Sequence, residues 1–298
     1  MKFLLSYDRM QDGIPLKREG RSSRTASSIS DPLHAALAHF LKKTAHFSKT
    51  APACESRIKR PAFPGSRKKT DAGPDVYKRQ QYDRVARYIC PSRYMEGLLL
   101  RTARFAGKTL VIPNCAALPP IPPGEEKGHY VLYFGRLSAE KGIARLLEIF
   151  RLLPDVPLIV AGSGPLEGEV IRCGLPNVRY AGFLQGEALA RLIAQAALTL
   201  CLPLWRENCP MAVIESMALG TPVLASREGG LPELIEEGVT GMLLDDASAH
   251  ACARAIGTLF ADTEALRAMS RACLKARSRR MTPQRYTDEL LGVYRAVL

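Results

Sequence analysis

The sequence predicts an α/β protein whose main part is a doubly wound parallel sheet, preceded by an incomplete α/β part. First, apolar runs and helical stretches alternate six times between residues 130 and 260. Second, the runs are short and almost wholly apolar, as in strands that helices cover on both faces. Third, the chain has 298 residues, 47% of them hydrophobic, which suffices for one large core or two ordinary ones. Successive strand–helix units of this kind imply parallel strands joined by crossover helices.

The first 80 residues differ in composition from the rest of the chain. They hold 17 Lys/Arg and 7 Asp/Glu, which supplies +10 of the formal net charge of +13. Stretches such as "REGRSSRTASSIS" are rich in serine and basic residues and predict a disordered arm. The hexapeptide "DVYKRQ" at 75–80 matches one reading frame of a common transposase sequencing adapter. We therefore expect that residues 1–74 and 81–298 were joined by misassembly.

An incomplete N-terminal α/β part is predicted over 81–122. "RVARYIC" has the composition of a strand, and "SRYMEGLLLRTA" that of a helix with Ser92 as its N-cap. "KTLVIPN" predicts a second strand. The Pro-rich stretch 115–128 then predicts a stiff linker.

The doubly wound domain is predicted over 123–281, followed by a C-terminal helix at 282–298. Its expected strands lie at 130–135, 157–162, 177–183, 198–203, 221–226 and 240–245. Its expected helices lie at 139–153, 166–173, 186–196, 210–219, 231–237, 247–260 and 262–280. Because ligands of open parallel sheets bind beyond the carboxyl ends of the strands, the loops at those ends form the candidate site.

The first of these loops is "FGRLSAEKG", which carries Arg136 and Lys141. Ser138 is the expected N-cap, which places Lys141 in the first turn of a helix. A cation there is opposed by the helix dipole, and an anionic ligand would offset that cost. Arg136, Lys141 and backbone N–H groups could together hold a diphosphate. The alternative is that Lys141 points into water.

The second loop, "AGSGPLEG" at 161–168, resembles a dinucleotide-binding turn but lacks the third glycine at the right offset. It also follows the second strand of the series and not the first. An NAD(P)-dependent oxidoreductase is therefore the weaker alternative, and a tight turn explains the glycines equally well.

The third loop opens "RENCPMAVIESMALGTPV" at 206–223. Pro210 and Gly220 delimit a helix over about 210–219. Glu207 precedes this helix, and the side chain of Glu215 leans back toward the helix N-terminus. Carboxylates repel phosphate but accept hydrogen bonds from hydroxyls. A ligand that has hydroxyl groups on both sides of a diphosphate is a nucleotide sugar. The alternative is that Glu215 is only a solvated helix position.

Taken in order, "FGRLSAEKG", "VAGSGPLEGE", "NVRYAGFL" and "RENCPMAVIESMALGTPVLASREGGLPELI" resemble the retaining glycosyltransferases of family 4, which have the GT-B architecture. "DRVARYICPSRYMEGLL" and "VIPN" are similar to the end of that family's N-terminal domain. The resemblance covers about 81–298 and implies a Rossmann-like donor domain whose last helix, at 282–298, returns to the N-terminal side. It also implies a cytoplasmic transferase of polysaccharide biosynthesis.

The resemblance implies specific roles. Arg136 and Lys141 would bind the donor diphosphate and stabilise its charge as it leaves. Glu207 would contact hydroxyls of the transferred sugar, and Glu215 those of the ribose. Leu184 would lie against the base. No metal is expected, because two cations and a helix dipole take its place. The backbone cradle of the donor would come from Cys209, Pro210, Met211 and Ala212.

The N-terminal region departs from the family pattern. The family's acceptor domain is a full doubly wound sheet with a Gly-rich loop and a histidine near the reacting sugar. Residues 1–80 show neither feature, and His34, His39 and His46 are candidates only by residue type. We expect a nearly complete donor half, a truncated acceptor half and impaired turnover. An inactive donor-binding fragment is therefore a further alternative.

Composition excludes some classes and favours others. The sequence has no run of eighteen apolar residues, so we expect no membrane-spanning helix. The apolar stretch at the start of the chain is too short for a secretory signal. The eight scattered cysteines predict free thiols and not a disulfide framework or a zinc site. The positive charge of the arm raises the alternative of nucleic-acid binding, which we consider the least favoured of the three functions. Peripheral contact with the inner membrane face is compatible with a transferase, because basic surfaces attract anionic lipids.

Overall fold

The computed structural model describes residues 85–119, 127–276 and 282–297. The chain divides into two units, one of Met1–Ser6 with Val76–Leu298 and one of Tyr7–Asp75, and all described residues belong to the first. The predictions for the basic arm, the adapter-like hexapeptide and the three early histidines therefore lie outside the described residues.

The N-terminal part forms a strand–helix–strand unit, as predicted. Strand β1 (Tyr88–Cys90) pairs in parallel with β2 (Thr109–Val111), and α3 (Arg93–Leu100) and a short 3-10 turn, η1 (Ala103–Phe105), connect them. The side chain of Ser92 caps α3 by accepting a hydrogen bond from the N–H of Met95 at 3.1 Å. This confirms Ser92 as the N-cap.

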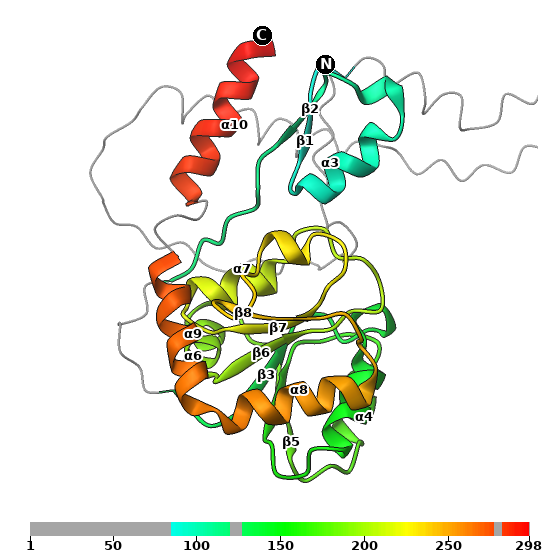
Figure 1. The fold of residues 1–298 in the computed structure, drawn as a ribbon, viewed down its shortest axis with the longest axis vertical. Coiled ribbons are helices and arrows are strands. Elements are labelled where there is room, and N and C mark those ends of the chain that lie inside the picture. Colours follow the sequence, from blue (N-terminus) through cyan, green and yellow to red (C-terminus); the bar gives the residue numbers. More distant parts are fainter. Residues whose placement is uncertain (1–84, 120–126, 277–281, 298) are drawn as a thin grey trace, which may run out of the picture. The chain divides into compact units, whose positions relative to one another are not determined.

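The main domain is a six-stranded parallel sheet with the strand order β5-β4-β3-β6-β7-β8 (Figure 1). Every pair of neighbouring strands is parallel. The chain therefore runs outward from β3 on one side and then returns to build the other side, which confirms the predicted doubly wound sheet. The strands are β3 (Val131–Phe134), β4 (Leu158–Ala161), β5 (Val178–Gly182), β6 (Leu198–Cys201), β7 (Val223–Ser226) and β8 (Gly241–Leu244).

Helices cover both faces of this sheet. Alternate residues of β3 point to opposite sides: Val131 and Tyr133 join the cluster that contains α4 and α8, and Leu132 and Phe134 join the cluster that contains α6. Helix α7 packs on β7 through a third cluster, and α9 contacts both α7 and α8. The helices are α4 (Ile143–Arg151), α5 (Glu167–Ile171), α6 (Gly186–Gln195), α7 (Met211–Ala218), α8 (Ala249–Ala261), α9 (Thr263–Ala276) and α10 (Pro283–Val297).

Two predicted helices differ from the structure. The helix expected from 139 is instead a 3-10 turn, η2 (Ala139–Lys141), and α4 begins after Gly142. Gly142 has φ 78°, a left-handed conformation that interrupts an α-helix. The segment 231–237 forms only the 3-10 turn η3 (Leu231–Glu233). Glycines that bracket this segment leave it too short for a stable α-helix.

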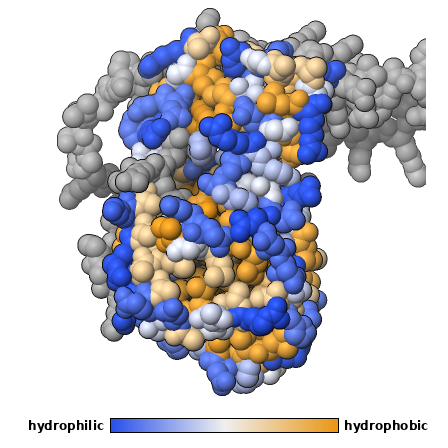
Figure 2. Space-filling view, viewed as in Figure 1, coloured by the Kyte–Doolittle hydropathy of each residue, from blue (hydrophilic) through white to orange (hydrophobic). Residues whose placement is uncertain are grey.

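Apolar residues reach the surface of the described chain in several places (Figure 2). In the described part, no helix is both long and apolar enough to cross a membrane. The seven cysteines that the structure describes are free thiols, as predicted for them.

Candidate functional site

The candidate site lies where the strand order reverses. Strand β3 is followed in the chain by β4 on one side, whereas β6 adjoins β3 on the other side. Crossovers leave this point in opposite directions, and ligands of open parallel sheets bind at such a point, beside the loops after β3 and β6. These are the two loops that carry Lys141 and Glu207.

Backbone hydrogen bonds join the strand-end loops into one surface. The N–H of Leu137 donates to the carbonyl of Ser163 at 2.8 Å, which links the loops after β3 and β4. The N–H of Leu204 donates to the carbonyl of Glu140 at 2.9 Å, which links the loops after β6 and β3. The loop after β7 is joined to that of β6 through Gly230, whose N–H donates to the carbonyl of Glu207 at 2.8 Å.

Lys141 and Glu207 form an ion pair across the β3 and β6 loops. The distance from Lys141 Nζ to Glu207 Oε1 is 2.6 Å. Glu207 is only 6% exposed, whereas the side chain of Lys141 keeps 26% of its area in contact with solvent. A partly desolvated pair of this kind interacts more strongly than a surface pair, because less water screens the charges.

Trp205 completes this arrangement, and the sequence analysis missed it. Its indole Nε1–H donates to Glu207 Oε1 at 2.7 Å. The ammonium of Lys141 lies 5.1 Å from the centre of the Trp205 ring, within range of a cation–π interaction. Trp205 is the chain's one tryptophan and stands two residues before Glu207, which is a signal that sequence reasoning could have used.

The environment of Lys141 corrects the sequence prediction. Lys141 ends a 3-10 turn and does not lie in the first turn of an α-helix, so the predicted opposition of a helix dipole was wrong. Ser138 precedes this turn, but its side chain does not cap it. The next residue, Gly142, packs closely against the β6 loop, since an added Cβ there would lie 2.6 Å from the carbonyl oxygen of Leu202.

Arg145 of helix α4 binds the β6 loop and the loop after β8, and no sequence pattern indicated it. Its guanidinium donates to the carbonyls of Leu202 at 2.7 Å and Pro203 at 2.9 Å. A third hydrogen bond of 2.9 Å reaches the carbonyl of Ala247. Arg145 lies on the first turn of α4, so it fixes the β6 loop against the helix that follows Lys141.

Desolvated side chains lie near the site at the ends of β3 and β6. The hydroxyl of Tyr133 donates to the carbonyl of Arg136 at 2.8 Å, and desolvation raises the pKa of the Tyr133 phenol well above its usual range. Desolvation, with a smaller contribution from the charge of Glu207, raises the pKa of Cys201 to about 12. Both groups are therefore neutral at physiological pH. Arg136 itself is exposed, on the same loop as Lys141.

Helix α7 begins at Met211 with Pro210 as its N-cap, one residue later than predicted, and no side chain caps its first turn. Its first N–H groups are therefore suited to an anion. Cys209 is buried just before the helix, and its carbonyl accepts a hydrogen bond from Asn114 Nδ2 at 3.1 Å. Met211 is 37% exposed.

The remaining predicted residues are less directly connected to the ion pair. Glu215 lies in the second turn of α7 and is half-buried. Ala212 and Leu184 are half-buried against the cluster of Leu132 and Phe134. The structure thus brings Lys141 and Glu207 into contact. It leaves Arg136 exposed on the same loop as Lys141.

The glycines of "AGSGPLEG" have a packing role. A Cβ at Gly162 would lie 1.9 Å from the carbonyl oxygen of Gly135, and a Cβ at Gly164 would lie 2.4 Å from that of Leu137. Both glycines therefore permit the loop after β4 to contact the backbone of the β3 loop. This contact explains the motif without a dinucleotide.

Further hydrogen bonds tie the N-terminal unit to the β6 and β7 loops. The carboxylate of Glu233 accepts from the N–H groups of Arg93 at 2.8 Å and Tyr94 at 2.6 Å, at the N-terminus of α3. The hydroxyl of Ser92 is hydrogen-bonded to the side chain of Asn208, next to Glu207. These contacts lie along a cleft of about 610 Å³ whose lining includes Ile214 of α7.

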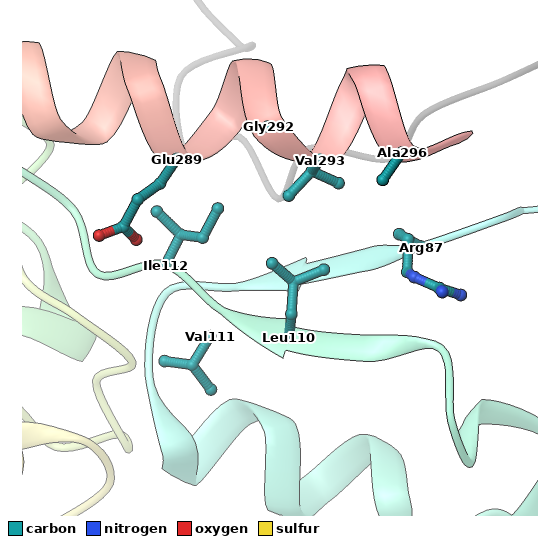
Figure 3. Close-up of a pocket in the computed structure, with 8 residues that line it drawn as sticks. All are labelled: Arg87, Leu110, Val111, Ile112, Glu289, Gly292, Val293 and Ala296. Carbon is teal, nitrogen blue, oxygen red and sulfur yellow. The ribbon is translucent and has the colours of Figure 1, made fainter. Parts of the chain in front are cut away.

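A second cleft, of about 410 Å³, lies away from the predicted site residues. It runs between α10 and β2, where Val293 and Ala296 face Leu110 and Ile112 (Figure 3). Its charged lining groups are Arg87 and Glu289. None of the predicted site residues lines either cleft. In the part of the chain that the structure describes, no group of three or more His, Cys, Asp or Glu side chains is arranged to hold a metal ion.

Comparisons with known proteins give related sequences. The chain is 32% identical to the sulfoquinovosyl transferase SQD2 of Arabidopsis thaliana over 146 residues, which are 47% of this chain and 28% of that protein. It is 32% identical to a D-inositol 3-phosphate glycosyltransferase of Segniliparus rotundus over 180 residues, 56% of this chain and 40% of that one. The chain spans less than half the length of these curated relatives.

Solved structures with the same fold include a sucrose-phosphate synthase from Thermosynechococcus elongatus. Its TM-score is 0.64 at 25% identity, over 77% of this chain and 63% of that one. Anabaena HepE in complex with UDP and glucose has a TM-score of 0.62 at 24% identity, over 70% and 62% of the two chains. These likenesses confirm the predicted GT-B fold class.

The family model described as "Glycosyl transferases group 1" matches residues 118–275, more than half of the chain. This range contains every residue predicted for the site, including the Lys141–Glu207 pair at the point where the strand order reverses. The chain belongs to the group 1 glycosyl transferases.

Proposed function

We propose that this protein binds a nucleotide-diphosphate sugar and transfers the sugar to an acceptor with retention of configuration. The observation that carries the proposal is the Lys141–Glu207 pair at the reversal of the strand order, where a cation and a carboxylate meet at 2.6 Å. A ligand with both a diphosphate and hydroxyls satisfies both groups. Anabaena HepE, which shares the fold, was solved with UDP and glucose.

The proposed chemistry requires stabilisation of a leaving diphosphate. Negative charge develops on that group as its bond to the anomeric carbon of the sugar breaks. The Lys141 ammonium has three N–H donors, of which Glu207 takes one, so others can reach phosphate oxygens. The exposed guanidinium of Arg136 on the same loop and the uncapped first turn of α7 supply further positive potential. Charge placed in advance is the largest catalytic contribution in many enzymes.

The hydroxyl groups of the donor would meet the carboxylates. Glu207 would accept hydrogen bonds from the transferred sugar, and Glu215 from the ribose. Leu184 would lie against the base, and the backbone at Cys209–Ala212 would complete the cradle. Retention follows from the resemblance to family 4. The acceptor would be a polysaccharide, lipid-linked or small-molecule alcohol, and peripheral contact with a membrane surface is compatible with it.

We further propose that donor binding needs no metal ion. Lys141 and Arg136 provide the positive charge that a divalent cation would otherwise bring to a diphosphate. The test compares the affinity for the nucleotide in excess EDTA with that in millimolar magnesium, and we expect the two affinities to be the same. A magnesium-dependent rise in affinity of about tenfold or more contradicts this proposal.

A donor-binding chain without turnover is the second candidate. The oxidoreductase alternative has lost its one motif, because the glycines of 161–168 serve loop packing. A titration with NADH separates it directly, since NADH would bind only in that case.

The test is isothermal titration calorimetry with UDP, GDP and ADP and their glucose or mannose derivatives. We expect one nucleotide to bind the wild-type chain, and Arg136→Ala, Lys141→Ala and Glu207→Ala each to lower the affinity for its sugar derivative by about tenfold or more. Glu228→Ala, an exposed carboxylate paired with Arg206, is the matched control. Unchanged affinity in all three site variants overturns the site.

A further inference from the structure

We propose that Trp205 is a positioning residue that fixes the Glu207 carboxylate so that its second oxygen faces the sugar of the donor. The proposal deepens the proposed function and rests on it. The observation behind it is a closed triangle of contacts among Trp205, Lys141 and Glu207.

Both hydrogen bonds of the carboxylate reach the same oxygen. Oε1 of Glu207 accepts from Lys141 Nζ at 2.6 Å and from Trp205 Nε1 at 2.7 Å. Among the residues that the structure describes, none donates a hydrogen bond to Oε2. Glu207 as a whole is only 6% exposed, but Oε2 is not among the polar atoms that are fully buried without a hydrogen-bond partner. The carboxylate therefore presents one oxygen, in one orientation, to a ligand.

The two donors differ in what they can do when a donor molecule binds. Lys141 carries a charge on a flexible stem and can turn toward a diphosphate, which weakens its hold on Glu207. The indole N–H of Trp205 is neutral and rigid, so a phosphate does not attract it as strongly. Trp205 therefore keeps the carboxylate in place while Lys141 serves the leaving group. It also contributes a ring surface under the ammonium at 5.1 Å.

The first test is spectroscopic and needs no donor. Because the chain has one tryptophan, its ¹H–¹⁵N spectrum has one indole N–H signal. We expect Glu207→Gln to move this signal upfield, since a neutral amide accepts a weaker hydrogen bond than a carboxylate. Glu228→Gln, in the neighbouring ion pair with Arg206, is the control and should leave it in place. An indole signal that ignores Glu207→Gln overturns the inference.

The second test separates positioning from a merely structural role. Trp205→Phe keeps an aromatic ring beside Lys141 but removes the N–H. We expect calorimetry to show about a tenfold loss of affinity for the nucleotide sugar, which is the worth of a hydrogen bond to a charged group, and less than about a twofold loss for the same nucleoside diphosphate without its sugar. Leu204→Ala truncates the adjacent exposed side chain and should change neither affinity.

The outcomes distinguish a failure of the positioning role of Trp205 from a failure of the proposed function on which that role rests. If the wild-type chain binds neither the nucleotides nor their sugar derivatives, the proposed function fails and the inference fails with it. If the wild type binds both and Trp205→Phe weakens both equally, or neither, the inference alone fails. A loss confined to the nucleotide sugar supports both.

Discussion

At the scale of single residues, the ion pair of Lys141 and Glu207 matters for stability as well as for binding. Glu207 is almost fully buried, so its charge depends on the groups that face it. Removing Lys141 would leave a desolvated carboxylate with only the indole N–H of Trp205. Leaving a buried charge unpaired costs more than the pair itself contributes to stability.

A double-mutant cycle measures this coupling. We expect Lys141→Met to lower the free energy of unfolding by about 1–3 kcal/mol, and the double variant Lys141→Met/Glu207→Gln to recover part of the loss, with a coupling energy of about 1–2 kcal/mol. The exposed i,i+4 pair Glu187–Arg191 is the matched control, with an expected coupling of about 0.5 kcal/mol or less. Urea denaturation supplies the free energies. Equal coupling in the two pairs would show that burial adds nothing.

Lys127 gives a prediction on pH. Its ammonium donates to the carbonyl of Ala194 at 2.6 Å and to Thr221 Oγ1 at 2.8 Å, and burial lowers the pKa of Lys127 to about 8 from an ordinary 10.5. Between these pH values the unfolded chain binds more protons at this site than the folded chain. The contribution of Lys127 to stability is therefore unfavourable below pH 8 and improves as the pH rises toward 10.5.

Comparison of the wild type with Lys127→Met isolates this effect from other titrations. The difference in free energy of unfolding, wild type minus variant, should rise between pH 8 and 10.5 by up to about 3 kcal/mol. Urea denaturation at several pH values measures it. A difference that falls or stays flat over this range for Lys127→Met contradicts the burial of a charged group.

At the scale of elements, the sequence predicted the strands well and the ends of helices less well. Apolar runs identified all six strands of the main sheet, because strands covered on both faces need apolar side chains throughout. The helix expected from 139 failed at Gly142, which has a left-handed φ of 78° and lies where an added Cβ would be 2.6 Å from the carbonyl oxygen of Leu202 in another loop. Local spacing does not contain such a contact.

Gly142 therefore has a larger role than a glycine in an open turn. Gly142→Ala should cost about 2–5 kcal/mol, because it adds left-handed strain to a clash with a backbone oxygen 2.6 Å away. Gly174→Ala is the matched control, since Gly174 has φ 67° but no atom within 4 Å of the added Cβ, and it should cost about 1–2 kcal/mol. Urea denaturation of the two variants gives the comparison. Equal costs would mean that the backbone conformation alone matters at 142.

At the scale of the whole molecule, the parallel sheet and the position of the site followed from the order of the elements. Six strand–helix units allow few topologies, and right-handed crossovers place the ligand loops at one edge. The partners within the site did not follow. Arg145 reaches carbonyls more than fifty residues away, and the ammonium of Lys141 meets the ring of Trp205 only once the β3 and β6 loops have packed. Such contacts depend on tertiary structure and leave no spacing in the sequence.

The last prediction concerns how much of the chain the donor site needs. All predicted site residues lie between 136 and 215, within the family match at 118–275. Residues 1–80 bring +10 of the charge, but at physiological salt charges are screened over about 8 Å. A chain of residues 81–298 should therefore bind the nucleotide within about twofold of the full chain, and Lys141→Ala should weaken both chains alike. Calorimetry at 0.15 M salt measures both. If removing residues 1–80 lowers the affinity tenfold while the thermal melt is unchanged, the arm takes part in binding and the proposed division of the chain is wrong.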